Sequence, residues 1–302
     1  MSLLVTGSIG IDTIHAPTGQ ADNVLGGSAI YFAAAASYWS PVRLVAAVGE
    51  DFPGELEKPF HAFDIDLAGL EKRVGSKTFR WTGKYLDNMN DRETLSVDLN
   101  VLAEDLPPVP DGFKDSSHVF LANTHPGGQL ALRSQFGDTK LVVADTMDLW
   151  IENERALLLD LLKQIDGLVL NDSESFLLTE ERNPVVAGRK ILEMGPKFVV
   201  IKKGEHGALI VHADSEAALP AFPAADVVDP TGAGDTFGGG MMGYLAAHGA
   251  IGDFATLVKA MAAGTVVASF NIEKFSLDRL LDLKRDDIDI RLKQYAAMVD
   301  VS

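Results

Sequence analysis

The chain has 302 residues, with 43 acidic and 26 basic side chains, a formal net charge of -17 and no cysteine. This length suits one large α/β domain with a small insertion, or two domains. The acidic balance argues against nucleic-acid binding and against adhesion to anionic membranes. The absence of cysteine excludes disulfides, thiol catalysis and a zinc ribbon. A small phosphorylated ligand stays compatible with the charge, because backbone amides can bind an anion locally.

Residues 1–7 are predicted to form a strand that ends in a glycine turn. They lack the basic start and the long apolar run of a signal peptide. No apolar stretch in the sequence reaches the length that a membrane span needs. We therefore expect a cytoplasmic protein.

Short apolar runs alternate with segments of helical period along most of the chain. The predicted strands, buried on both faces, are residues 3–6, 42–48, 118–122, 141–144, 168–170 and 198–201. The predicted helices are residues 27–39, 129–136, 154–163, 173–178, 185–193 and 236–247. This alternation predicts a doubly wound, mainly parallel sheet flanked by helices, with 207–211 and 221–222 as an antiparallel edge.

Residues 77–102 break this rhythm, because apolar side chains alternate there as in a β-hairpin with one apolar face. Together with residues 11–25, this segment predicts a small β-sheet that serves as a lid, as a homodimer contact, or as both. The α/β domain then comprises 1–10, 26–76 and 103–302. Phe79 and Trp81 share a face of the hairpin, where they suit either a substrate contact or a small core.

The sequence DPTGAGD at residues 229–235 precedes an apolar helical pattern. The amides of Gly232, Ala233 and Gly234 converge at a helix N-terminus, which is a favourable place for an anion. Asp235 stands where a phosphoryl group is held on one side and a hydroxyl proton is accepted on the other. We expect a low pKa for Asp235, because a helix N-terminus stabilises a carboxylate. The alternative is an acid that only complements the helix dipole.

Residues 229–241, DPTGAGDTFGGGM, resemble the C-terminal signature of the ribokinase-like (PfkB) carbohydrate kinases. Further landmarks of that family occur in the right order over nearly the whole chain. They are the turn with Asp12, the pair Gly26 and Gly27, the turn at 48–54, Asn171 and Glu174 in NDSE, and Gly204 and Gly207 in KKGEHGAL.

The resemblance implies an ATP-dependent kinase that phosphorylates a primary hydroxyl of a sugar or sugar derivative. A nucleoside kinase of the same fold is the alternative, and a sugar- or nucleotide-binding protein without turnover is a second one. Phosphoryl transfer needs alignment and charge neutralisation more than covalent help. By the resemblance, the amides of residues 232–234 stabilise the transferred group, and Asp235 accepts the hydroxyl proton.

The resemblance also assigns the ligand contacts. Asp12, Gly26 and Gly27 would bind the acceptor. The nucleotide side would be formed by Asn171, Glu174, Lys202, Gly204, Gly207 and Thr231. Mg²⁺ would be held through water by Asn171 and Glu174, K⁺ or another monovalent cation by Asp229 and Thr231, and adenine near residues 259–269.

The sequence departs from the family pattern at two positions. Tyr31 stands where many members have a substrate-binding asparagine, so the predicted contact there is altered. Lys202 stands where many have threonine, and it either reaches a phosphate or is solvated. His125 follows a predicted strand and is a candidate substrate contact. A dinucleotide site is disfavoured because residues 7–12 lack GxGxxG spacing, and no P-loop sequence occurs.

Overall fold

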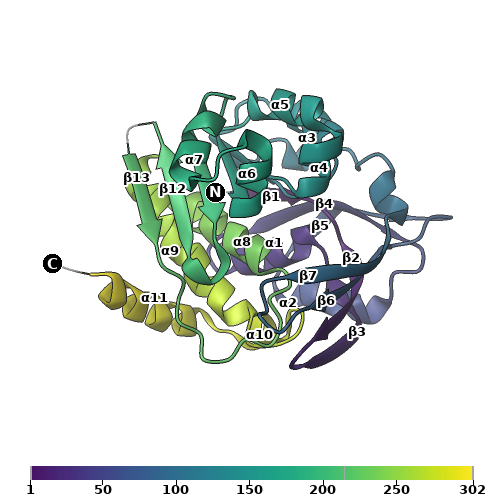
Figure 1. Ribbon diagram of the computed structural model, residues 1–302. Coiled ribbons are helices and arrows are strands. Elements are labelled where there is room, and N and C mark those ends of the chain that lie inside the picture. Colours follow the sequence, from purple (N-terminus) through teal and green to yellow (C-terminus); the bar gives the residue numbers. More distant parts are fainter. Residues whose placement is uncertain (1, 214, 301–302) are drawn as a thin grey trace.

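A large β-sheet forms the centre of this protein, and most helices pack against it. The computed structural model describes residues 2–213 and 215–300, and within them this sheet has nine strands in the order β13-β12-β11-β10-β9-β8-β1-β4-β5 (Figure 1). In chain order these are β1 (Leu3–Thr6), β4 (Val42–Gly49), β5 (Asp66–Arg73), β8 (His118–Leu121), β9 (Leu141–Asp145), β10 (Gly167–Asn171), β11 (Phe198–Lys202), β12 (Ala208–His212) and β13 (Ser215–Leu219).

The strands from β5 to β11 run parallel, and β12 and β13 add an antiparallel edge. The predicted doubly wound, mainly parallel sheet is confirmed, because its central strands are the continuous apolar runs of the sequence. Two predictions fail at the edges. The strand β5 was not predicted, since half of its residues are exposed and most of these are charged. Residues 221–222 are not a strand: they lie between Pro220 and Pro223, and proline cannot donate to a strand ladder.

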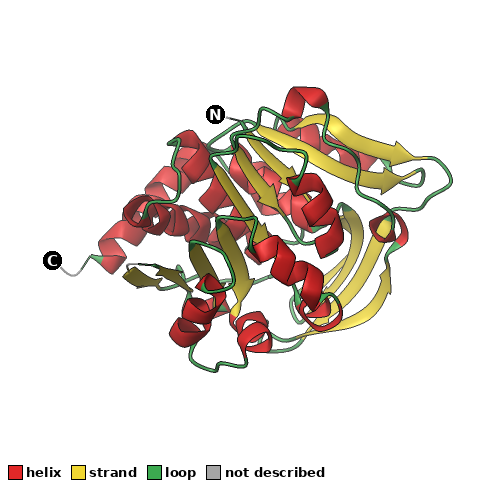
Figure 2. Ribbon diagram, turned by 90° about the horizontal axis from the view of Figure 1, so that it is seen from above, coloured by secondary structure: helices red, strands yellow, loops and turns green. Residues whose placement is uncertain are grey.

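Helices cover both faces of the large sheet (Figure 2). One hydrophobic cluster packs α1 (Ser28–Ser37), α2 (Lys58–Ala62), α8 (Ala233–Ala247), α9 (Phe254–Asn271), α10 (Asp278–Asp282) and α11 (Arg285–Val299) on the first face. A second cluster packs α3 (Pro126–Arg133), α4 (Asp148–Asn153), α5 (Arg155–Leu162), α6 (Asp172–Thr179) and α7 (Pro184–Leu192) on the other. Four short 3₁₀ turns complete the described chain, at Gly54–Glu57, Asn100–Ala103, Asp111–Phe113 and Gly204–His206.

The helix α9 is the one element of the described residues that is long and apolar enough to cross a membrane. Its mean hydropathy is 1.3, and 61% of it is buried inside the fold. It packs against α8 within the first hydrophobic cluster. Its composition is therefore accounted for by a place in the core.

The small sheet, called the lid below, stands beside the body at the β2–β7 side of Figure 1. Its four strands, all within the described residues, are ordered β3-β2-β6-β7. They are β2 (Gly10–Ala16), β3 (Gly19–Gly26), β6 (Phe79–Tyr85) and β7 (Arg92–Asp98). β2 and β6 pair in parallel, and each outer strand is antiparallel to its neighbour. The sheet contains the residues predicted for it, and the exact domain boundaries stay a prediction.

The hairpin has no continuous apolar face, which differs from the predicted alternation. All seven residues of β7 are exposed, including Leu95 at 53% and Val97 at 51%. The strand ends at Asp98, and Val101 is buried in the 3₁₀ turn that follows. The alternation therefore spans an exposed edge strand and a separate turn.

Candidate active site

Asp12 lies on β2 of the lid and is buried, with 4% of its surface exposed. A Cβ atom at Gly26 would lie 1.9 Å from Asp12 Oδ2, so glycine makes room for this carboxylate. Asp12 Oδ1 has no hydrogen-bond partner among the described residues. Burial, followed by the charges of Asp229 and Asp235, raises the pKa of Asp12 to about 7. A buried carboxylate with an unused oxygen is well suited to accept hydrogen bonds from ligand hydroxyls.

The loop 229–235 leads into α8. Gly232 is the residue before the helix, in the left-handed conformation with φ 72°. Thr231 N donates to Asp229 Oδ1 at 2.9 Å, and Ser276 N donates to Asp229 Oδ2 at 3.1 Å. These two hydrogen bonds to the Asp229 carboxylate fix the conformation of the loop. The Ala233 amide donates to Pro230 O at 3.1 Å, so an anion at the helix N-terminus would share this donor or take it from the turn.

Tyr31 lies directly behind this loop, with 1% of its surface exposed. A Cβ atom at Gly232 would lie 2.3 Å from Tyr31 Cγ, so the ring packs against the glycine backbone. Burial and the nearby carboxylates of Asp229 and Asp12 raise the pKa of the Tyr31 hydroxyl well above its usual range. The structure therefore gives Tyr31 a supporting place, and its predicted contact with substrate stays a prediction.

The expectation of a low pKa for Asp235 is wrong. Burial raises the pKa of this carboxyl to about 6, against the opposing effects of Lys202 and Arg92, and Glu174 raises it further. The cost of burying the ionised carboxylate therefore outweighs its stabilisation by the helix N-terminus. The position of Lys202 explains its effect: a Cβ atom at Gly234 would lie 2.9 Å from Lys202 Nζ. Lys202 Nζ thus lies at the loop, and its contact with a phosphate stays a prediction.

Asn171 and Glu174 lie at the end of β10 and form a capping box of α6. Glu174 N donates to Asn171 Oδ1 at 2.7 Å, and Asn171 N donates to Glu174 Oε2 at 2.7 Å. This capping box occupies Glu174 Oε2 and leaves Glu174 Oε1 outside it. Burial raises the pKa of Glu174, and Lys202 opposes that rise. No group of three or more acidic or histidine side chains among the described residues is arranged to hold a metal directly.

Asp145 was missed by the sequence reasoning. It ends β9 beside β10, it is 5% exposed, and Asp145 Oδ1 has no hydrogen-bond partner among the described residues. Burial and the charge of Asp235 hold its pKa well above the usual range. An acid at the carboxyl end of a predicted parallel strand was the available signal, because ligands bind at that edge.

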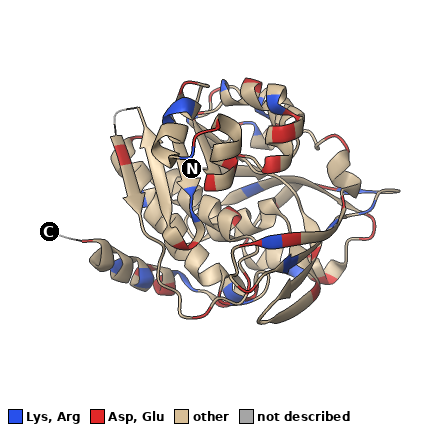
Figure 3. Ribbon diagram, viewed as in Figure 1, with Lys and Arg blue, Asp and Glu red and all other residues tan. Residues whose placement is uncertain are grey.

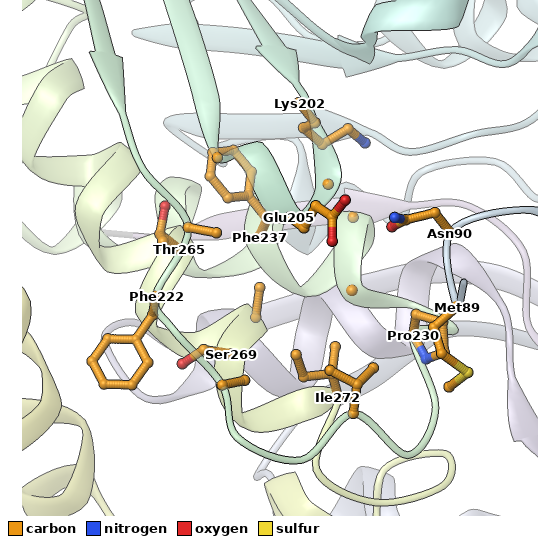
Figure 4. Close-up of a pocket in the computed structure, with 18 of the residues that line it drawn as sticks. Met89, Asn90, Lys202, Glu205, Phe222, Pro230, Phe237, Thr265, Ser269 and Ile272 are labelled. Atoms are coloured by element: carbon orange, nitrogen blue, oxygen red, sulfur yellow. The ribbon is translucent and has the colours of Figure 1, made fainter. Parts of the chain in front are cut away.

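A cavity of about 480 Å³ opens between the loop, the β11–β12 turn and α9. Figure 4 shows Lys202, Glu205 and Asn90 at one end and Phe222, Ser269 and Ile272 at the other. The cavity is lined by Gly204 and Gly207, by the α8 residues 233 and 234, and by residues 265, 268 and 269 of the segment expected near adenine. That these residues bind a nucleotide stays a prediction. The lid tip, residues 88–90, reaches the same cavity.

The two predicted aromatic contacts of the lid have different surroundings. Trp81 pairs in parallel register with Asp12, so both side chains lie on one face of the lid. Trp81 Nε1 donates to Thr94 Oγ1 at 3.2 Å. Phe79 packs against Gly10, where a Cβ atom would lie 2.6 Å from its Cδ1. Trp81 is therefore beside Asp12, and Phe79 lies at the junction of lid and body.

His125 is occupied by structural contacts. Its Nδ1 accepts from Gly127 N at 3.1 Å and caps α3, and its Nε2 lies 3.5 Å from Glu154 Oε1. The ring also meets Trp150 edge-on, with centroids 5.3 Å apart. A contact of His125 with substrate stays a prediction.

Comparisons with known proteins agree with this architecture. The pfkB family carbohydrate kinase model matches residues 129–282. A cytidine kinase from Thermococcus kodakarensis is 30% identical over 256 residues, which cover 81% of this chain and 88% of that protein. The structure of Burkholderia thailandensis nucleoside kinase in complex with inosine has a TM-score of 0.76 at 20% identity, covering 97% of this chain and 98% of that one.

The structure of aminoimidazole riboside kinase from Salmonella enterica, complexed with aminoimidazole riboside and an ATP analogue, has a TM-score of 0.77 at 17% identity. It covers 97% of this chain and 100% of that chain. These two structural likenesses confirm the predicted ribokinase-like fold. The family match and the cytidine kinase relative go further, because they rest on the sequence itself. The chain therefore belongs to the pfkB family of carbohydrate kinases, and it is a phosphotransferase that uses an alcohol group of a sugar or nucleoside as its acceptor.

Proposed function

We propose that this kinase phosphorylates a hydroxyl group of a nucleoside and uses ATP as the donor. The observation that carries the choice of a nucleoside over a free sugar is the pairing of Trp81 with Asp12 on one face of the lid. A carboxylate recognises ribose hydroxyls, and an indole ring beside it offers a surface on which a base stacks. The 30% identity to a cytidine kinase supports the same choice.

We propose that Asp235 is the base of the reaction. The acceptor oxygen attacks the γ-phosphorus, the bond from that phosphorus to the bridging oxygen of ADP breaks, and the hydroxyl proton passes to the Asp235 carboxylate. A pKa of about 6 leaves Asp235 mostly ionised at pH 7 and close enough to neutrality to hold the proton. Such a base is better matched to the task than the low-pKa carboxylate that the sequence predicted.

We assign the anion hole to the amides of residues 232–234, assisted by Lys202. Gly232 has the left-handed conformation that begins α8, and the Tyr31 ring packs against it, so an anion would compete with Pro230 O for the Ala233 amide. Amides at a helix N-terminus stabilise charge on the transferred group. The cavity beside α9 would take the nucleoside part of the donor, because its α9 end is mostly apolar.

Mg²⁺ fits the acidic group at the ends of β9 and β10. Glu174 Oε1 lies outside the capping box, and Asp145 Oδ1 is buried without a partner, so both carboxylates have an oxygen left for a hydrated cation. We propose that Asn171, Glu174 and Asp145 orient the water shell of this ion. When bound, Mg²⁺ neutralises phosphate charge. We retain K⁺ near Asp229 and Thr231 as a prediction, tested by replacing K⁺ with Na⁺ in the assay.

We also propose a homodimer through the lid. The strand β7 is an exposed edge with unpaired backbone groups along its outer side, and it carries Leu95 and Val97 half-exposed. Such an edge readily pairs with another strand. The proposal requires only that two lids meet at β7, and it leaves the active site of each chain complete.

An acceptor panel tests the proposed substrate class. Purified protein is incubated with ATP and Mg²⁺ and with cytidine, uridine, inosine, adenosine, ribose or fructose, and the phosphorylated products are identified by mass spectrometry. We expect a nucleoside to exceed ribose in kcat/KM by about 100-fold or more, and Trp81→Ala to reduce this preference. Equal or better use of a free sugar would instead identify a sugar kinase. An Asp235→Asn sample serves as the control for contaminating kinases.

A further inference from the structure

The lid brings an arginine to the same face that carries Asp12 and Trp81. Arg92 pairs in register with Tyr85 on the neighbouring strand. Tyr85 lies four residues after Trp81 on β6, so the two side chains share a face of the sheet. The Arg92 guanidinium carbon lies 5.9 Å from the centre of the Trp81 ring. Arg92 therefore belongs to the side of the lid that faces the cleft.

A hydrogen bond joins this part of the lid to the loop at α8. Thr231 Oγ1 donates to Tyr85 Oη at 3.1 Å, across 146 residues of sequence. Thr231 directly precedes Gly232, whose amide belongs to the proposed anion hole. The loop is tied on its other side by the bond from Asn271 Nδ2 to Thr231 O at 2.8 Å. Tyr85 thus fixes the lid at the place where the phosphoryl group would be transferred.

The cleft is strongly acidic and needs cations for this chemistry. The Asp235 carboxyl is surrounded by Asp12 from β2, Asp145 from β9 and Glu174 from α6, and by the cations Lys202 and Arg92. Arg92 lies opposite Tyr85, which contacts the loop through Thr231, and the charge of Arg92 lowers the pKa of Asp235 and of Glu174. Lys202 comes from the rigid sheet, whereas Arg92 comes from the lid.

We propose that Arg92 is a catalytic residue that the closed lid places against the transferred phosphoryl group, with Tyr85 as the positioning residue that holds the lid at the loop. Charge on the transferring group would then be met by Lys202 from the body and by Arg92 from the opposite side. Arginine suits this role because its planar guanidinium binds phosphate oxygens in pairs. Phosphoryl transfer would become efficient only when the lid has closed over the acceptor.

The competing interpretation is that Arg92 only stacks on Trp81 and braces the lid. Arg92→Gln removes the charge and keeps a polar chain of similar length, and Arg92→Lys keeps the charge. All of β7 is exposed, so neither substitution disturbs a core. Lys84→Gln is the matched control: Lys84 is an exposed cation of the same lid, and it alternates with Tyr85 onto the other face.

The test compares these variants with the wild-type enzyme in steady-state kinetics, with the acceptor that the panel identifies. We expect Arg92→Gln to lower kcat by about 100-fold or more while the KM values change little, and Arg92→Lys to recover part of the loss. Tyr85→Phe is expected to lower kcat less than Arg92→Gln. Lys84→Gln should stay close to wild type.

Two further measurements separate catalysis from bracing. ADP with aluminium fluoride, which mimics the phosphoryl group in transfer, should bind Arg92→Gln about tenfold or more weaker, while ADP itself binds as in the wild type. The acid limb of kcat/KM should move to higher pH when the Arg92 charge is lost, because that charge lowers the pKa of Asp235.

Three outcomes would overturn the proposal: a kcat of Arg92→Gln within about threefold of wild type, an equal loss in Lys84→Gln, or a change confined to KM. The proposal rests on phosphoryl transfer at the 229–235 loop. If Asp235→Asn were as active as the wild type, phosphoryl transfer would not take place at this loop. That result would refute the proposed function, and it differs from each of the three outcomes that refute the role of Arg92.

Discussion

Asp235 lies in the first turn of α8, and its proposed role is to accept the proton of the acceptor hydroxyl. We predict that Asp235→Asn lowers kcat by a factor on the order of 10²–10⁴, since the variant keeps the shape of the loop and loses the proton acceptor. Nucleotide affinity should stay within a few-fold, because the amides of residues 232–234 survive. Steady-state kinetics and calorimetric titration with ADP measure the two effects. Turnover near the wild-type value would remove Asp235 from the mechanism.

Asp12 shows that the site is maintained at the expense of stability. Its folded-state pKa of about 7 lies above the usual aspartate value of 3.8, so the native protein binds more protons than the unfolded chain between these pH values. The resulting destabilisation is absent below about pH 4, grows as the pH rises, and is complete above about pH 7. This loss of stability amounts to about 2–4 kcal/mol, because part of the pKa shift is shared with the neighbouring carboxylates.

We therefore predict that Asp12→Asn raises the Tm of the ligand-free protein at pH 8 and changes it little at pH 4, while acceptor binding is lost. Thermal unfolding at both pH values measures the first effect, and titration with the acceptor measures the second. Asp98→Asn, which neutralises an exposed carboxylate of the lid, is the control for net charge. A lower Tm for Asp12→Asn at pH 8 would show that the ionised carboxylate is compensated in the fold.

At the scale of elements, β3 of the lid is held to the body by the bond from Ser276 Oγ to Leu25 O at 2.6 Å, whereas β6 and β7 have few side-chain bonds to the body. Besides the bond from Thr231 to Tyr85, Arg80 pairs with Asp51 at 3.2 Å and both side chains are partly exposed. Segments held in this way open at low free energy. We predict that residues 77–102 gain protection from hydrogen exchange when acceptor and nucleotide are both bound. Mass spectrometry of the exchanged peptides measures this gain, and unchanged exchange at saturation would argue against a lid that closes.

The elements that could be predicted are those whose structure is determined by the residue pattern within the element itself. The strand β9 is a continuous apolar run between polar turns, and α7 combines a helical period with an Asn-Pro start, so both could be predicted within a few residues. The strand β5 could not, because an edge strand buries only part of its surface and its pattern is mixed. Local pattern also predicted the glycine-rich start of α8, although its first residue lies at Ala233.

The properties of the site depended on contacts between distant residues, which the sequence does not display. The raised pKa of Asp235 comes from burial among acids on other elements, and it reversed an expectation based on the helix end alone. Tyr85 and Thr231 meet only because the lid folds back over the body. Motif positions were thus predictable from residue type and spacing, whereas electrostatics and lid contacts needed the structure.

At the scale of the whole molecule, the carboxylates on the surface and those in the cleft have different roles. Figure 3 shows carboxylates distributed over the helices on both faces of the sheet and over the lid. Exposed charges of this kind keep a protein soluble and contribute little to its fold. The carboxylates in the cleft come from the lid, from strand ends and from α8, so the lid and the body must come together to form the site. In the proposed mechanism, catalysis therefore depends on the position of the lid.

The exposed edge of β7 leads to a prediction about assembly. If two lids pair there, the purified protein should have twice the chain mass of 32.4 kDa in light scattering or sedimentation. We predict that Leu95→Lys shifts it toward the monomer, because a charge at the centre of an edge strand disfavours pairing with a second strand. Ile251→Lys is the matched control, since Ile251 is 68% exposed in the turn between α8 and α9. A wild-type protein that stays monomeric at micromolar concentration would exclude this dimer, and a dimer that survives Leu95→Lys would place the interface elsewhere.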